Sequence, residues 1–183
     1  RKRIFRESIA LREHRRHKPP RALERVFYTF DLLGDYGMYR DLHRHRMLTQ
    51  WRQPLTTRFG YDTPPELEDA GLTQTYHAAM AQAKETFEAI AADFPNEAQY
   101  VVPMAYRIRW SMHVNLRALT WLVELRSTPQ GHPGYRHIAQ ALFREVQRVQ
   151  SRLAEWMKFV DLDGYTLGRL DAEVRQESKS CES

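Results

Sequence analysis

Polar and apolar residues alternate strictly in one short segment of the chain. Single polar residues, which include Arg107 and Arg109, separate Tyr106, Ile108, Trp110, Met112 and Val114. A repeat of two residues is typical of a strand with one buried face and one polar face. The pattern therefore predicts a strand over residues 105–115, with Arg107 and Arg109 on its polar face.

Elsewhere the apolar residues recur at the three- and four-residue spacing of helices. The first stripe follows Pro19 and Pro20 and consists of Leu23, Val26, Phe27, Phe30 and Leu33. Because proline is well tolerated in a first helical turn, this stripe predicts a helix from near Arg21 to Arg46. Residues 47–61 are irregular and contain Pro54 and Gly60, which predicts a binding loop or short strands.

Three further helices are predicted after that segment. Helix-start signals at residues 63–69 precede a stripe of Tyr76, Met80, Ala83, Phe87 and Ile90. Asn115 is a good N-cap for a helix that ends before Pro129, and the last stripe runs from Ile138 to Val160. The expected fold class is α+β, a helix-rich domain with a small antiparallel sheet.

The composition favours one soluble, cytoplasmic domain. Of the 183 residues, 42% are hydrophobic and 28% are charged, which is typical of a globular protein. No run of about 20 apolar residues and no secretory signal is recognisable, so no membrane partner is expected. Cys181 is the single cysteine, which leaves no disulfide framework. We expect a basic arm at 1–20, a main domain at 21–175 and a polar tail at 176–183, with missing sequence before residue 1.

The arm carries a dense group of basic residues. They are Arg1, Lys2, Arg3, Arg6, Arg12, Arg15, Arg16 and Lys18. Such a group is the electrostatic signature of nucleic-acid binding, but it also fits a solvated helix. Because Glu7 and Glu13 interrupt the group, the solvated helix is the preferred interpretation, and nucleic acid is not the expected partner.

The most unusual segment is Arg40-Asp41-Leu42-His43-Arg44-His45-Arg46, at the predicted end of the first helix. So many arginines together suit a bound anion, because arginine binds phosphate and carboxylate groups bidentately. Two other interpretations stay open. The positive charge can compensate the helix dipole, or His43 and His45 can bind zinc, although the flanking arginines would repel a dication.

A second group of polar residues surrounds the helix that begins at Asn115. Arg117 lies in the first turn, where a cation opposes the helix dipole, and Arg126 closes the helix. A phosphate bound at the helix start would explain Arg117, and so would a nearby glutamate.

These segments, in this order, resemble the flavin-dependent thymidylate synthase family, whose signature reads RHRxxSxNExSxRY. Arg44-His45-Arg46 and Thr56-Thr57-Arg58-Phe59 are similar to the two ends of the signature, and residues 24–30 to the segment before it. Residues 98–103 resemble the family's Ala-Arg-x-Val-Leu-Pro segment. Val114-Asn115-Leu116-Arg117 and Leu125-Arg126 are similar to its Val-Asn-Ala-Arg and Leu-Arg positions. The resemblance covers residues 22–160.

The resemblance implies a homotetrameric enzyme that binds FAD between subunits and converts dUMP to dTMP with NADPH and methylenetetrahydrofolate. The residues that would contact FAD are Arg44, His45, Arg46, Asn115 and Arg117. Thr56, Arg58 and Arg126 would face the nucleotide. Because the flavin carries the hydride chemistry, no catalytic cysteine is required.

The chain departs from the family at positions that would contact the nucleotide. Gln99 stands in place of an arginine, Asp41 in place of a glutamine, and Trp51, Arg52 and Gln53 lie where the family has Asn-Glu. We therefore expect FAD binding to be kept and dUMP binding to be weak, with dUMP or a related anion as partner. The alternatives are a catalytically silent flavoprotein subunit and a basic nucleic-acid-binding module, whose binding would weaken steeply with salt.

Overall fold

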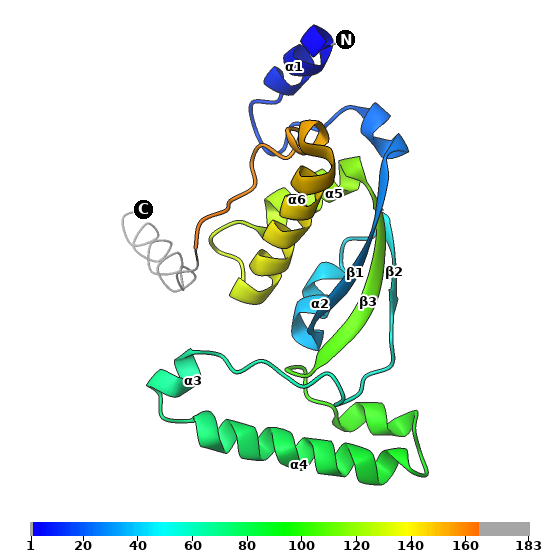
Figure 1. The fold of residues 1–183 in the computed structure, drawn as a ribbon, viewed down its shortest axis with the longest axis vertical. Helices are drawn as coiled ribbons and strands as arrows, with labels where there is room; N and C mark the ends of the chain where they lie inside the picture. The colour runs from blue at the N-terminus through cyan, green and yellow to red at the C-terminus, as the bar shows by residue number, and fades with distance from the viewer. Residues whose placement is uncertain (1, 165–183) are drawn as a thin grey trace, which may run out of the picture. The chain divides into compact units, whose positions relative to one another are not determined.

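A computed structural model describes residues 2–164, which form two compact units (Figure 1). One unit contains the chain up to Tyr28 and from His113 onward, and the other contains Thr29–Met112. We call them the terminal unit and the central unit. The predicted polar tail, with Cys181, lies outside the described residues.

The sheet contains three antiparallel strands in the order β1-β3-β2. These strands span Phe27–Asp35 (β1), Arg107–Asn115 (β3) and Leu48–Arg52 (β2). Strand β3 confirms the predicted alternation, because Ile108, Trp110 and Met112 are buried whereas Arg109 and Ser111 are exposed. With about 50% helix beside this sheet, the α+β fold class is confirmed.

The predicted helix over residues 21–46 is wrong for most of its length. The segment forms a 3-10 helix η1 (Arg21–Arg25), strand β1 and a short helix α2 (Tyr36–Leu42). Exposure alternates along β1, whose first residues are the aromatic and β-branched types that fit a half-buried strand. Pairing with β3 therefore overrides the helical spacing, which the same apolar residues also satisfy.

Helix α2 begins at a capping aspartate and ends earlier than expected. Asp35 Oδ1 accepts a hydrogen bond from Met38 N–H at 2.7 Å, which satisfies a donor in the first turn. The helix ends at Leu42 rather than near Arg46. The segment 44–46 therefore lies in the turn between α2 and β2, and not on a helix.

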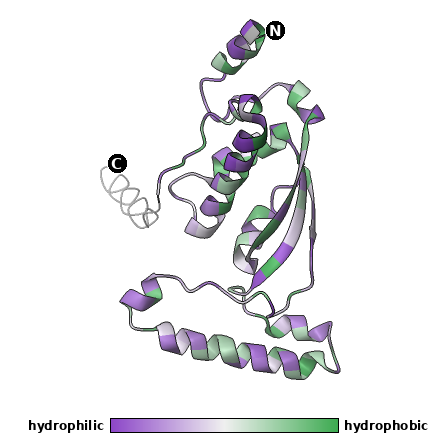
Figure 2. Cartoon of the chain, viewed as in Figure 1, coloured by the Kyte–Doolittle hydropathy of each residue, from purple (hydrophilic) through white to green (hydrophobic). Residues whose placement is uncertain are grey.

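The rest of the central unit is mainly helical. Helices α3 (Glu66–Asp69) and α4 (Thr73–Ala91) are separated at Gly71, whose φ of 67° favours glycine. The predicted stripe of α4 is the buried and half-buried side of a largely exposed helix, and Figure 2 shows hydrophilic and hydrophobic residues interleaved along it. A second 3-10 helix, η2 (Glu97–Val101), packs against α4.

The terminal unit consists of α1 (Lys2–Ala10), η1, α5 (Leu116–Arg126) and α6 (Pro133–Ala154). Leu119 and Leu122 of α5 and Leu142 and Val146 of α6 are buried in its core. The last helix ends at Ala154 rather than Val160, after a non-helical backbone at Gln150 (φ −146°, ψ 65°). Within residues 2–164, no helix combines the length and apolar character that crossing a membrane requires.

Candidate functional site

The turn that carries Arg44, His45 and Arg46 is anchored to the end of α2. His45 N–H donates a hydrogen bond to Leu42 O at 3.1 Å. Arg44 and Arg46 are exposed, while His45 is half-buried. The central unit therefore presents two guanidinium groups from one hydrogen-bonded turn, an arrangement that suits an anionic ligand.

Arg44 forms an ion pair with Asp41 from the last turn of α2. The pair is partly exposed, with 63% of the Arg44 side chain and 32% of the Asp41 side chain accessible. Because water and salt screen such a pair, a phosphate dianion can compete with Asp41 for the guanidinium. Asp41 thus lowers the attraction of the turn for anions without abolishing it.

His43 makes contacts within its own segment. Its ring stacks on the Tyr39 ring with centroids 5.4 Å apart, and its Nδ1 lies 2.8 Å from Arg40 O. Among the residues that the structure describes, no group of three or more His, Cys, Asp or Glu side chains could hold a metal ion. The geometry therefore lends no support to zinc binding by His43 and His45.

The loop after β2 carries Thr56 and Arg58, the residues expected to face the nucleotide. The Arg58 guanidinium lies over the Phe59 ring at 4.7 Å, and its Nη2 donates to Gln53 Oε1 at 3.3 Å. The turn that follows contains Gly60 at φ 66°, a conformation that favours glycine. Arg58 is exposed, so its positive charge faces solvent.

Gln99 of η2 lies beside this loop. Its Oε1 accepts a hydrogen bond from Leu55 N–H at 3.0 Å, and its Nε2 donates to Asn96 O at 3.3 Å. The structure thus brings Gln99 next to the segment of Thr56 and Arg58. In this chain the side chain supports the backbone of the loop and offers no cation.

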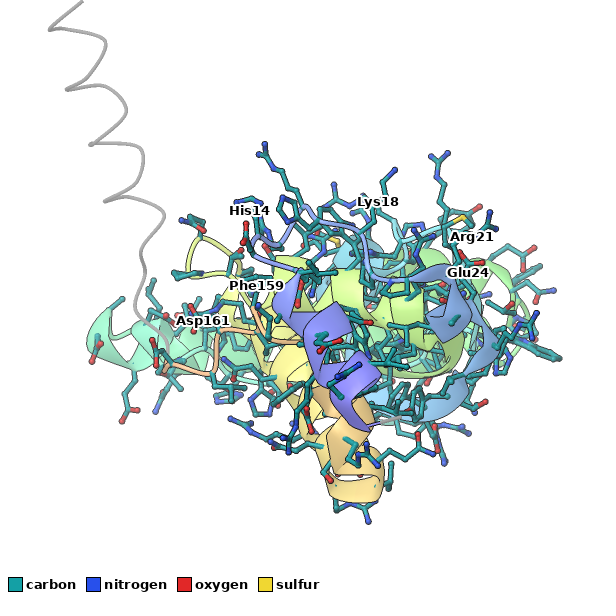
Figure 3. All side chains as sticks on the ribbon, turned by 90° about the horizontal axis from the view of Figure 1, so that it is seen from above. His14, Lys18, Arg21, Glu24, Phe159 and Asp161 are labelled. Atoms are coloured by element: carbon teal, nitrogen blue, oxygen red, sulfur yellow. The ribbon has the colours of Figure 1, made fainter. Side chains whose placement is uncertain are left out.

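In the terminal unit, Arg117 is held by two partners at the start of α5. Its Nη1 donates to Glu24 Oε1 at 2.7 Å, and its Nε donates to Pro19 O at 2.8 Å. Glu24 also pairs with Arg21, which lies beside it in Figure 3. The hydrogen bond from Arg21, and to a smaller extent the one from Arg117, lowers the pKa of Glu24. The nearby glutamate that would explain Arg117 without a ligand is therefore present.

Asn115 and Arg126 lie at the two ends of α5. Asn115 caps the helix as predicted, because its Oδ1 accepts a hydrogen bond from Ala118 N–H at 2.9 Å. The amide nitrogen of Asn115 can still donate to a ligand. Arg126 lies over the Tyr135 ring at 5.1 Å, a cation–π contact that draws it towards α6.

Arg12 is buried, so the prediction that it lies on a solvated basic face is wrong for this residue. Its guanidinium donates to both carboxylate oxygens of the fully buried Glu124, one of them at 2.6 Å, and to Trp156 O at 2.8 Å. Phe159, labelled in Figure 3, donates its N–H to the same carboxylate at 3.2 Å. The sequence does not distinguish Arg12 from the neighbouring arginines, because its partner is distant along the chain.

The candidate residues belong to different units. The turn at 44–46 and the loop at 56–58 are parts of the central unit, whereas Asn115, Arg117 and Arg126 are parts of the terminal unit. Each set is basic and at least partly accessible, so each can contact an anion by itself.

The chain is similar in sequence to proteins that are about three times as long as the part it matches. A UPF0159 protein of Chlamydia pneumoniae is 53% identical over 174 residues, which cover 95% of this chain and 33% of the relative. A UPF0159 protein of Thermoplasma acidophilum is 42% identical over 172 residues, which cover 93% of this chain and 34% of the relative. The chain thus spans about a third of the length of the curated relatives it matches.

The family match includes the candidate ligand-binding residues described above. A family model described as thymidylate synthase complementing protein matches residues 6–150. This range contains the turn at 44–46, the loop at 56–58 and helix α5. Because the match covers most of its length, the chain belongs to the thymidylate synthase complementing protein family, which is the family of the flavin-dependent thymidylate synthases.

Proposed function

We propose that this chain is an FAD-binding, thymidylate synthase-like part of a longer enzyme. The observation that carries the proposal is the family match over residues 6–150, which includes the exposed turn with Arg44-His45-Arg46. In the proposed reaction, dUMP or a related anionic nucleotide is reductively methylated with methylenetetrahydrofolate and NADPH. Bound flavin supplies hydride transfer, and the residues of the chain bind and orient the ligands.

In the central unit, the turn at 44–46 suits the pyrophosphate of FAD. Arginine donates paired N–H groups to two oxygens of one phosphate, and Arg44 and Arg46 come from the same turn. Both side chains are exposed, so binding does not require a buried contact to break. Arg44 would exchange its contact with Asp41 for the ligand, and His45 can donate from a ring nitrogen.

In the terminal unit, Asn115 and Arg117 are proposed as a separate FAD contact. The N-terminus of α5 favours negative charge through its dipole and its N–H groups. The Arg117 side chain is 27% exposed and its partner Glu24 is 33% exposed, so a phosphate can reach the guanidinium. Asn115 would add the N–H donors of its amide group.

Nucleotide binding is proposed to be weaker than flavin binding. Thr56, Arg58 and Arg126 remain as candidate contacts, but Gln99 supplies no positive charge and Asp41 repels a phosphate dianion. A missing charge-assisted hydrogen bond lowers affinity by about 1.5–3 kcal/mol. We therefore expect the protein to bind dUMP more weakly than FAD.

Assembly and location form part of the same proposal. By resemblance to the family, the longer protein is expected to be a cytoplasmic homo-oligomer, with FAD held where subunits meet. Light scattering on the full-length protein, with and without FAD, measures this directly.

A fluorescence titration of the full-length protein with FAD tests the proposal. We expect a dissociation constant in the micromolar range or tighter, on the order of 8 kcal/mol of binding free energy. Arg46→Ala should weaken binding about ten- to a hundredfold, the loss expected for one charge-assisted contact. Arg40→Ala is the matched control, because it removes the same charge from exposed Arg40 on α2 but touches no proposed contact. Failure of the unmodified protein to bind FAD would refute the proposal.

A further inference from the structure

The chain from the end of α1 to the start of η1 carries four cations and one carboxylate. The cations are Arg15, Arg16, Lys18 and Arg21, and the carboxylate belongs to Glu13. All of these side chains are exposed except Arg15, which is half-buried, and Figure 3 shows Lys18 and Arg21 along the same side of the terminal unit. We call residues 13–21 the basic segment. Its positive charges follow one another along the chain, which suits a ligand with several phosphates in a row.

The buried Arg12 holds the backbone of the basic segment in place. Its guanidinium donates to His17 O at 2.8 Å and to Arg15 O at 3.0 Å. The same guanidinium pairs with the buried Glu124 carboxylate of α5. A turn within the segment is closed by His17 N–H, which donates to His14 O at 2.9 Å. Because the segment is fixed to α5 before a ligand binds, binding costs less conformational entropy than it would for a mobile arm.

The fold places an indole ring beside these cations. The basic segment itself contains no Phe, Tyr or Trp, but the Arg15 guanidinium lies 5.9 Å from the centroid of the Trp121 ring of α5. This distance is at the outer limit of a cation–π contact, so the two groups are neighbours and not a tight stack. Trp121 is 41% exposed, and an exposed indole is a flat platform on which an aromatic base can stack.

A row of cations beside an aromatic platform favours single-stranded nucleic acid over an acidic protein as the ligand. Arginine donates paired N–H groups to phosphate and to carboxylate alike, so the charge of the basic segment does not decide between the two. Trp121 does, because an unpaired base presents a flat aromatic face that an acidic peptide lacks. The combination of a basic path with a stacking side chain is typical of surfaces that bind single strands.

We propose that the basic segment and Trp121 form a surface for single-stranded nucleic acid, with one base stacked on the indole and successive phosphates near the cations. The interpretation of the basic arm as a solvated helix fits α1 alone, because that helix ends at Ala10 and the basic segment follows it. The proposal goes beyond the flavin and dUMP sites, shares no residue with them and does not depend on them.

Fluorescence anisotropy of a labelled oligoadenylate, titrated with the full-length protein, tests the proposal. A strand of about 12 nucleotides lies within the site sizes of single-strand-binding folds. We expect a dissociation constant between about 1 and 100 μM at physiological salt, the range of binding that does not depend on sequence. If the four cations each contact a phosphate, the logarithm of the association constant should fall with the logarithm of the salt concentration with a slope of about −3. An abasic strand of the same length and polyglutamate should both bind more weakly.

Variants of Trp121 test the stacking contact. Trp121→Leu should weaken binding about fivefold or more and leave the salt slope unchanged, because it removes the platform and no charge. Trp121→Phe keeps an aromatic face and should bind more tightly than Trp121→Leu. Phe94→Leu is the matched control, because it removes a 59% exposed ring from the central unit.

A charge variant tests the phosphate contacts. Arg16→Gln should reduce the magnitude of the salt slope by about 0.7, the change expected for one phosphate contact on a single strand. Arg144→Gln is the matched control, because it removes an exposed arginine from α6 of the same unit but outside the basic segment. That variant should leave the slope unchanged.

The proposal is overturned if the oligoadenylate does not bind, or if Trp121→Leu binds it as tightly as the unmodified protein with its fold intact by circular dichroism. An unchanged salt slope in Arg16→Gln would also overturn it. Polyglutamate that binds as tightly as the oligoadenylate would point to an acidic protein as the partner instead. A protein that binds FAD but fails this test retains the proposed function, and one that passes it without binding FAD retains the nucleic-acid surface alone.

Discussion

Arg117 Nη1 donates a 2.7 Å hydrogen bond to Glu24 Oε1, so the cation at the start of α5 already has an anionic partner. An FAD phosphate would have to share or replace that carboxylate. Glu24→Gln should therefore strengthen FAD binding, by about fivefold at most, because a neutral amide competes less with the phosphate for Arg117 and solvent screens the original pair. Fluorescence titration of the full-length protein measures the change.

The control for this prediction is Arg21→Ala, which removes the other arginine that pairs with Glu24 and leaves Arg117 in place. Its effect on FAD affinity should be small. If Glu24→Gln leaves FAD affinity unchanged while Arg46→Ala lowers it, Arg117 serves only to hold Glu24 and Pro19.

Asn115 is expected to have two separable functions, a helix cap through its oxygen and a ligand donor through its nitrogen. Asn115→Ala should cost about 1 kcal/mol of stability, because Ala118 N–H loses its acceptor. Asn115→Asp keeps the acceptor and should preserve stability. Both variants should weaken FAD binding, since neither has the amide donor. Urea unfolding and FAD titration of the same samples provide the two measurements, and full FAD affinity in both variants would contradict the second function.

The buried pair of Arg12 and Glu124 should dominate the stability of the terminal unit. Arg12→Ala leaves a carboxylate buried without its cation, so we expect a loss of about 3–5 kcal/mol in the free energy of unfolding. Arg3→Ala is the control, because the Arg3 side chain is 86% exposed in its pair with Glu7. That variant should change stability by less than about 1 kcal/mol. If urea unfolding shows a similar decrease in the free energy of unfolding for both variants, the buried pair stabilises the protein no more than the exposed pair does.

Restoring positive charge near the loop at 56–58 should improve dUMP binding. Gln99→Arg combined with Asp41→Gln adds a cation and removes a carboxylate that repels phosphate. The structure adds a cost, because Gln99→Arg also removes the acceptor of Leu55 N–H. Gln99→Ala with Asp41→Gln has the same cost without the new charge and is therefore the matched control. Calorimetry with dUMP should show tighter binding in the arginine variant than in this control; equal binding in the two would place Gln99 outside the nucleotide site.

Strong local patterns in the sequence predicted their elements correctly. The alternation on β3 and the cap at Asn115 depend on residues close together in the chain, so both could be recognised without tertiary information. Strand β1 could not, because its apolar residues fit a helix as well as a strand and its pairing with β3 decides between them. Helix α2 ends at Leu42, whereas the sequence predicted an end near Arg46, because the local pattern does not show where the chain turns towards β2.

For the candidate site, the sequence identified residue types and their order but not their partners. Gln99 lies beside the loop of Thr56 and Arg58, because its side-chain oxygen accepts a hydrogen bond from Leu55 N–H. The contact of Arg117 with Glu24 and the burial of Arg12 against Glu124 join residues that are far apart in the chain. No local spacing encodes such pairs, so only the fold reveals them.

The visible absorption spectrum of the full-length protein, purified without added flavin and then mixed with FAD, tests the central claim most directly. The proposed function predicts the bands of bound oxidised flavin after purification or after mixing, and their loss in a variant that combines Arg46→Ala with Arg117→Ala. A protein that stays colourless and leaves the spectrum of added FAD unchanged would contradict it.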